Sequence, residues 1–192
     1  MISSAQSSSR SRGEKVLDRA RVAWAAEKGL LNYRTLREER NRLQIDTLQR
    51  RHFGEWSDIF NSLEKCGGKV MICLLGKTVV GYQAFTPYST RGNPFPEDMR
   101  VMRFTYVQIR EDNVVQARGF GIASELIAKT LELAWSWDYE AVYTYTVAYE
   151  LLEKAGFRSM GGEGIVREAR HVRDFNPDQA PPLLFYIERK YS

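Results

Sequence analysis

Cysteine is scarce in this chain, whose 192 residues include only Cys66 and Cys73. Two cysteines are too few for a disulfide framework, so we expect reduced thiols beside or inside a strand. Long apolar runs are also missing: the longest covers Val70–Leu75, whereas a membrane-spanning helix needs about 20 residues. No secretion signal is recognisable. The composition argues against a secreted or membrane-spanning protein, and we expect a cytoplasmic one.

Histidine is equally rare, since His52 and His171 are the only two in the sequence. His52 follows Arg51 outside the motifs described below, and His171 lies in a basic stretch. Neither histidine has a neighbouring histidine or cysteine at the spacing of a metal site. We therefore expect no bound metal.

The charge is unevenly distributed along the chain. Residues 1–52 contain 12 Lys and Arg against 6 Asp and Glu, whereas residues 53–192 contain 16 against 18. A basic N-terminal segment can contact nucleic acid or another anionic surface. Between residues 37 and 42, however, the two signs interleave as they do on a solvated helix face. Both interpretations stay open: an anionic partner and a solvated face.

The N-terminal part has two sections. Residues 1–13 are rich in serine and arginine, lack acidic residues and carry too little apolar surface to fold alone. This composition is also typical of an organelle transit peptide, but because the pattern is short we expect a flexible tail. Residues 14–29 carry apolar residues such as Ala20 and Trp24 at helical spacing, which predicts a basic helical extension. Residues 30–192 then form one domain.

The remaining chain changes between helical and strand periodicity. Gly76-Lys77 separates two apolar runs and is typical of a two-residue hairpin turn. Strands are expected at 30–36, 69–75, 78–86, 101–109, 140–146, 164–173 and 183–190, and helices at 37–51, 56–63, 121–137 and 148–155. This order predicts an α/β (α+β) domain with a mixed, mostly antiparallel central sheet flanked by helices.

Two glycines, Gly119 and Gly121, lie between the strand expected at 101–109 and the helix expected at 121–137. A residue without Cβ lets the backbone approach a ligand closely. The first turn of a helix leaves N–H donors unpaired and carries partial positive charge. Together with the cation of Arg118, these features predict an anion-binding loop.

Two common nucleotide-binding loops fit less well. A Walker loop is excluded because no Gly-Lys-Ser/Thr follows the glycines. The dinucleotide fingerprint needs Gly or Ala where Ser124 stands, although Asp138 and Glu140 lie near the distance of its ribose-binding acid. The upstream hairpin does not suit a doubly wound sheet. A Rossmann-type domain therefore stays an alternative that Ser124 disfavours.

Three segments in a fixed order carry a family resemblance. Residues 77–81 read KTVVG, residues 116–123 read QARGFGIA and residues 148–157 read AYELLEKAGF. They resemble the hairpin, the pyrophosphate motif and the short-helix motif of the GNAT superfamily of acyl-CoA-dependent N-acyltransferases. The resemblance extends over roughly residues 69–157.

The resemblance implies an acyl-CoA co-substrate, most simply acetyl-CoA. The backbone of Val107 and Ile109 would pair with the pantetheine arm. The thioester would lie in a gap between the strands at 101–109 and 140–146. Backbone N–H groups from Ala117 to Ile122 would hold the pyrophosphate. The expected cofactor-binding residues of this segment are Gln116, Ala117, Arg118, Gly119, Phe120, Gly121, Ile122 and Ala123.

The acid and the base of the reaction are less clear. Relatives often carry a tyrosine four residues before Gly156, where this chain has Leu152, and the strand at 101–109 holds no carboxylate. We take Tyr149, one turn before Leu152, as the candidate acid for the thiolate, and Glu111 as the candidate base. Each has a simpler interpretation: the tyrosine as a packed aromatic and the glutamate as a solvated loop acid.

These features favour an N-acyltransferase, most simply an acetyltransferase, in which an amine attacks the thioester directly. The basic N-terminal segment slightly favours a macromolecular acceptor, which includes modification of nucleic acid. The missing tyrosine and carboxylate favour instead a non-catalytic GNAT-like module that binds acyl-CoA or a protein partner. The sequence leaves the acceptor amine, the acyl chain and the oligomeric state open.

Overall fold

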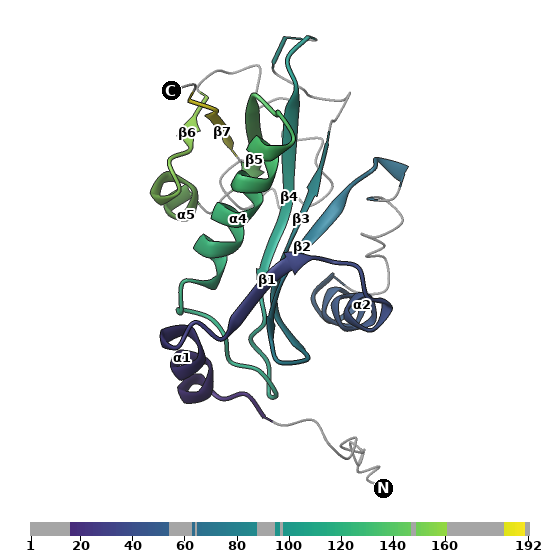
Figure 1. Ribbon diagram of the computed structural model, residues 1–192, viewed down its shortest axis with the longest axis vertical. Helices are drawn as coiled ribbons and strands as arrows, with labels where there is room; N and C mark the ends of the chain where they lie inside the picture. The colour runs from purple at the N-terminus through teal and green to yellow at the C-terminus, as the bar shows by residue number, and fades with distance from the viewer. Residues whose placement is uncertain are drawn as a thin grey trace, which may run out of the picture.

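The computed structural model describes residues 16–53, 63, 65–87, 95–96, 98–146, 149–160 and 183–190 (Figure 1). The elements in chain order are α1 (Arg19–Glu27), β1 (Leu31–Thr35), α2 (Glu39–Phe53), β2 (Lys69–Leu75), β3 (Thr78–Thr86), β4 (Val101–Ile109), α4 (Ile122–Ser136), β5 (Ala141–Thr146), α5 (Tyr149–Lys154), β6 (Arg158–Ser159) and β7 (Leu183–Glu188). None of the helices among these residues is long and apolar enough to cross a membrane.

The strands form one sheet in the order β1-β2-β3-β4-β5-β7-β6. Every neighbouring pair is antiparallel except β4 and β5, which are parallel. These two central strands pair only between Val101–Arg103 and Ala141–Tyr143. Beyond Arg103 they diverge, which opens the sheet at its centre. The mixed, mostly antiparallel α/β (α+β) architecture expected from the sequence is confirmed.

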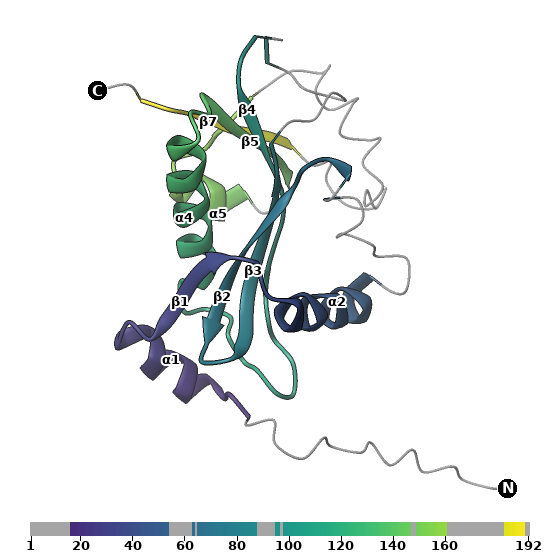
Figure 2. The ribbon, with the colours of Figure 1, turned by 45° about the vertical axis from the view of Figure 1, so that its right-hand side comes forward.

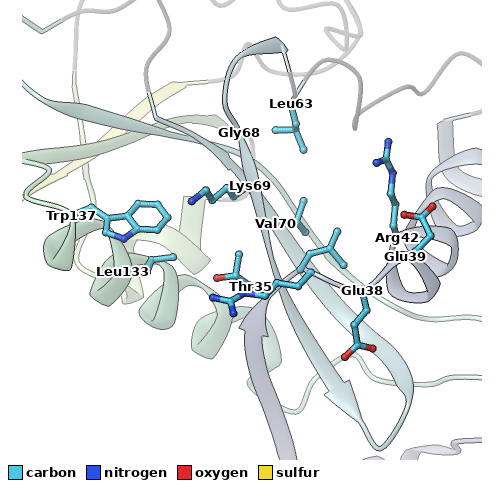
Figure 3. Close-up of a pocket in the computed structure, with 12 residues that line it drawn as sticks. Thr35, Glu38, Glu39, Arg42, Leu63, Gly68, Lys69, Val70, Leu133 and Trp137 are labelled. Carbon is cyan, nitrogen blue, oxygen red and sulfur yellow. The ribbon is translucent and has the colours of Figure 1, made fainter.

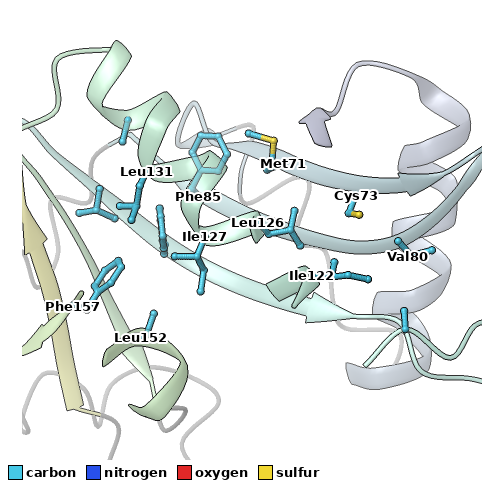
Figure 4. Packing of buried hydrophobic residues seen from close by; sticks show 14 of the residues in the cluster. Met71, Cys73, Val80, Phe85, Ile122, Leu126, Ile127, Leu131, Leu152 and Phe157 are labelled. Atoms are coloured by element: carbon cyan, nitrogen blue, oxygen red, sulfur yellow. The ribbon is translucent and has the colours of Figure 1, made fainter. Parts of the chain in front are cut away.

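The helices cover both faces of this sheet (Figure 2). Helices α4 and α5 lie on one face and α2 lies on the other. Under α4, the apolar side chains of Leu126 and Ile127 face Met71 and Phe85 of the sheet (Figure 4). Gly81 of β3 allows this close packing, because a Cβ there would stand 3.1 Å from Ile122 Cγ2. The glycine thus fixes how near the start of α4 lies to the sheet.

The N-terminal helix differs from the prediction. Residues 16–18 are not helical, and α1 begins at Arg19 because the Asp18 side chain caps it by accepting from the Arg21 N–H at 2.9 Å. Its buried residues are Val22 and Ala25, whereas Trp24 is 56% exposed. The predicted apolar face was therefore wrong.

Both cysteines are free thiols, Cys66 exposed and Cys73 buried in β2. Burial raises the pKa of the Cys73 thiol to about 12, although a hydrogen bond from Tyr33 acts in the opposite direction. At neutral pH this thiol is protonated and behaves as a small apolar core residue. The expectation of reduced cysteines agrees with this placement.

Some expected features lie outside the described residues. They are the tail at 1–13, most of the helix at 56–63, the strand at 164–173 and His171. Leu63 alone represents that helix, and it is buried in helical conformation.

Candidate functional site

The glycine-rich loop connects β4 to α4 and depends on its two glycines. Gly119 has φ +89° and Gly121 has φ +73°, both in the left-handed region that side-chain-bearing residues avoid. Gly121 is also the N-cap of α4 and offers no side chain to the helix. The chain therefore turns sharply here and leaves the helix N-terminus uncovered by side-chain caps.

The N–H groups of this loop divide into two sets. Gln116 donates to the Leu17 carbonyl and Ala117 to the Arg110 carbonyl, each at 3.0 Å, and the Arg118 N–H donates to Glu111 Oε2 at 2.9 Å. From residue 119 to residue 124, no acceptor in the described part of the chain takes a backbone N–H. These donors surround one helix N-terminus, so they fit a phosphate or pyrophosphate.

The first half of the loop is held by a buried ion pair. Arg110 is 7% exposed and its Nε lies 2.8 Å from Asp112 Oδ2. The other carboxylate oxygen accepts the N–H groups of Val114 and Val115, both at 2.8 Å. Burial alone would raise the pKa of Asp112, but the bonds from Arg110 and the two N–H groups hold it below its usual value. These contacts within the chain therefore define the conformation of residues 110–115.

Glu111, the candidate base, belongs to this loop. Its carboxylate accepts the Arg118 N–H and lies 3.9 Å from Arg19 Nη1. Tyr149, the candidate acid, lies on α5, and Figures 1 and 2 show α5 well above the loop, beside the middle of α4. The structure therefore does not bring the two candidates together, and the contacts of Glu111 are those of a loop-stabilising residue.

The N-terminal segment packs directly against the loop. Leu17 pairs with Val115 in a parallel bridge, and its N–H donates to the Val114 carbonyl at 2.7 Å. The Arg19 guanidinium lies 5.1 Å from the Phe120 ring centroid, and its Nη2 lies 3.3 Å from where a Cβ on Gly119 would stand. This cation was not predicted for the site; the basic composition of residues 1–52 was the only sequence signal for it.

The divergence of β4 and β5 leaves a pocket of about 220 Å³. A register shift between Ala84 and Phe85 marks a bulge at Thr105, and the pocket begins there. The pocket is lined by Gln83, Phe104, Thr105, Val107, Ile127, Thr144, Tyr145, Thr146, Leu151 and Leu152. It is the gap expected between the two strands, now located between α4, α5 and the sheet.

The backbone of β4 faces this pocket at alternate residues. The Arg110 N–H donates to the Val80 carbonyl at 2.9 Å, so Gln108, two residues earlier, also turns its backbone toward β3. The register is unbroken between Tyr106 and Ile109. Val107 and Ile109 therefore turn their N–H and C=O groups to the other side, where β5 has diverged. This is the geometry that backbone pairing with an extended ligand requires.

Tyr149 and Leu152 occupy different surroundings on α5. The Tyr149 ring stacks on Phe185 of β7, with centroids 5.5 Å apart and planes at 23°. Leu152 is buried and lines the pocket. The pocket thus has an apolar side chain where relatives often carry a tyrosine. The aromatic packing expected from the simpler interpretation of Tyr149 is therefore present, and it concerns the ring and not the hydroxyl.

Polar atoms in the pocket were not predicted. The Thr105 Oγ1 is buried and has no hydrogen-bond partner in the described structure. Gln83 is 1% exposed, and its Oε1 lies 3.2 Å from the hydroxyl of Thr130 on α4. Neither residue belongs to a motif, and Thr105 reaches the pocket only because of the bulge.

A larger pocket, of about 530 Å³, lies where β1 ends (Figure 3). Lys69 extends toward Trp137, with its Nζ 4.4 Å from the ring centroid, and residues 37–39 and Arg42 add charges of both signs. Trp137 is the C-cap of α4, so this pocket lies at the opposite end of that helix from the glycine loop. It is therefore separate from the site built around the loop.

Many solved structures resemble this one, and three acetyltransferases are among them. One from Bacillus subtilis, in complex with CoA, is 14% identical with a TM-score of 0.57, covering 83% of this chain and 99% of that chain. A GNAT family N-acetyltransferase from Escherichia coli, in complex with CoA, is 21% identical with a TM-score of 0.57. The match covers 81% of this chain and 79% of that chain. One from Elizabethkingia anophelis, with acetyl-CoA bound, is 11% identical with a TM-score of 0.59. The match covers 83% of this chain and 99% of that chain.

The sequence itself matches no family model and no curated protein. At these low identities the structural likeness establishes the architecture: an α+β domain whose central parallel pair of strands diverges beside a glycine loop. This architecture is the GNAT fold, and the resemblance seen in the sequence is confirmed at the level of the fold.

Proposed function

We propose that the chain is an acyl-CoA-dependent N-acyltransferase, most simply an acetyltransferase. The observation that carries the proposal is the set of uncommitted N–H donors at residues 119–124, placed at the end of the strand that leads into the pocket. Solved proteins of the same fold hold CoA or acetyl-CoA, which supports the same ligand class here.

Each part of the site would hold one part of the co-substrate. The N–H groups of residues 119–124 and the cations of Arg19 and Arg118 would bind the pyrophosphate. The gap-facing backbone of Val107 and Ile109 would orient the pantetheine arm, and the pocket would hold the thioester. Such positioning, with water excluded by the apolar wall, supplies much of the rate of a direct transfer.

The transfer itself is a single exchange of bonds. The amine nitrogen forms a bond to the thioester carbonyl carbon, and the bond from that carbon to sulfur breaks. The nitrogen loses a proton to a base or to water, and the thiolate gains one. We keep Tyr149 as the proposed acid. Glu111 would act as a base only through water, because loop contacts hold its carboxylate.

One observation favours a second function. The pocket lining contains no Asp, Glu or His among the described residues, and Leu152 is apolar. Such a lining also suits a module that binds acyl-CoA without transferring the acyl group.

Two measurements test the proposal. Acetyl-CoA should raise the melting temperature of the protein, whereas NAD should leave it unchanged. Release of free thiol from acetyl-CoA in the presence of an amine panel should exceed the rate without protein. No stabilisation by acetyl-CoA would refute the ligand class; stabilisation without thiol release would favour the binding module.

Replacing Arg19 by glutamine is expected to weaken acetyl-CoA binding about fivefold, since one partly exposed charge-assisted contact contributes roughly 1 kcal/mol. Isothermal titration with acetyl-CoA measures the change. S-acetylpantetheine, which lacks the pyrophosphate, should bind both forms equally. Lys28→Gln removes the same charge from just beyond α1, away from the loop, and should have no effect. Equal losses from both variants would contradict a local contact.

Replacing Tyr149 by phenylalanine is expected to slow turnover at least about tenfold, because a positioned acid contributes that much or more. The substitution keeps the ring that stacks on Phe185, so a circular dichroism melt serves as the check that the variant is folded. Turnover of acetyl-CoA with a saturating amine is the measurement. An unchanged rate would leave Tyr149 with a packing role only.

A further inference from the structure

Arg103 stands at the point where β4 and β5 separate. It forms the last of the paired positions, opposite Tyr143. Its neighbours Met102 and Phe104 belong to the core beneath α4, so by strand alternation Arg103 points to the other face of the sheet. There its guanidinium carbon lies 5.7 Å from the centroid of the Tyr145 ring.

In the part of the chain that the structure describes, this arginine has an aromatic neighbour but no anionic one. Its Nε is buried and has no hydrogen-bond partner, and no carboxylate of the described residues lies within ion-pair distance of it. Arg110, just beyond the other end of β4, is by contrast paired with Asp112. An arginine is always charged, and a buried donor without a partner costs free energy. The arrangement therefore suits an anion supplied by a ligand.

The co-substrate does not provide that anion. Its phosphates fit the glycine loop beyond Ile109, about 20 Å along β4 from Arg103. Between the phosphates and the acyl group, the pantetheine arm of an acetyl-CoA carries no charge. Tyr145 lines the pocket and also contacts Arg103. The Tyr145 side chain therefore separates the guanidinium from the pocket proposed for the thioester.

We propose that the acceptor is a small amine that also carries an oxyanion, a carboxylate or a phosphate, and that Arg103 binds this group. The inference rests on the proposed acyltransferase function. On the face to which Arg103 points, the partly buried rings of Tyr145, Phe95 and Tyr186 would contact the carbon skeleton of the acceptor. The buried Tyr143 ring supports them, with its centroid 5.6 Å from that of Phe95. The unpaired Thr105 Oγ1 offers an acceptor for the amine.

The test compares charged and neutral acceptors of matched skeleton. Phenylalanine is paired with phenylalaninamide, and O-phosphoethanolamine with ethanolamine, and thiol release from acetyl-CoA gives kcat/KM for each. We expect at least one anionic acceptor to exceed its neutral partner at least about tenfold, and the pair that shows this distinguishes carboxylate from phosphate. Arg103→Gln should abolish that preference by raising KM, and calorimetry should show the same loss in acceptor binding to the CoA-loaded protein.

Arg100→Gln is the matched control, because Arg100 also lies over a tyrosine ring, that of Tyr139, at 5.4 Å. It should keep the preference, and both variants should bind acetyl-CoA as the parent does. Equal use of charged and neutral amines, an unchanged preference in Arg103→Gln, or efficient transfer only to a protein or nucleic acid would overturn the inference. Failure of the parent protein to bind acetyl-CoA would instead refute the proposed function itself.

Discussion

Glutamate in place of Gly121 is expected to lower the affinity for acetyl-CoA at least about 100-fold. The site has φ +73° and open space around it, so the side chain has room but the backbone is strained by about 1–2 kcal/mol. The larger part of the loss in acetyl-CoA affinity comes from the negative charge of the new side chain. A carboxylate at the N-cap of α4 would compete for the N–H groups that would bind the phosphates and would repel those phosphates. Isothermal titration with acetyl-CoA measures the loss.

A glutamate at a second glycine serves as the control that separates the effect of the added charge from the effect of backbone strain. Gly76 in the β2–β3 turn has φ +60° and equally open surroundings. Gly76→Glu should therefore lower the melting temperature about as much as Gly121→Glu does, while acetyl-CoA binding stays as in the parent. If Gly121→Glu still bound acetyl-CoA with the parent's affinity, the loop would not be the phosphate site.

Proline in place of Val107 is expected to reduce acetyl-CoA affinity at least about tenfold while the protein stays folded. The Val107 N–H faces the gap between β4 and β5, so its removal breaks no bond between strands. A ligand that pairs with this strand would lose one hydrogen bond, and the proline ring would occupy part of its place. Titration with acetyl-CoA, beside a circular dichroism melt, gives both quantities.

The neighbouring residue provides the contrast. The Gln108 N–H faces β3, where it is part of the ladder, so Gln108→Pro should lower the melting temperature much more than Val107→Pro does. Equal melting temperatures for the two variants would show that the backbone orientation inferred for β4 is wrong. Normal acetyl-CoA binding by Val107→Pro would remove the strand from the proposed site.

The sequence predicted the central elements well because their signals are local. Gly76-Lys77 marks the turn between β2 and β3, and both strands have the bounds expected from the apolar runs. Gly119 and Gly121 mark the turn between β4 and α4, and both have the positive φ that a residue without Cβ adopts most readily. That this loop binds an anion stays a prediction. Each of these features depends on residues close to one another in the chain.

Other features depend on contacts between distant residues. Nothing near Glu111 in the sequence shows that its carboxylate meets the Arg118 N–H, because that contact needs the folded loop. The buried face of α1 is set by packing against the loop and the core, not by the pattern of the helix alone. The bulge at Thr105 results from a register shift between two strands, which sequence periodicity does not specify.

The pairing of Leu17 with Val115 has a kinetic consequence. These two residues are about 100 positions apart in the chain, and their pairing holds the N-terminal segment against the glycine-rich loop. Contacts between such distant residues carry a loop-closure cost in entropy and form slowly. The segment before α1 would therefore dock late in folding and detach first when the protein opens locally. A bound acyl-CoA, by holding the loop, would slow hydrogen exchange at the Leu17 N–H, far along the chain from every glycine in the loop.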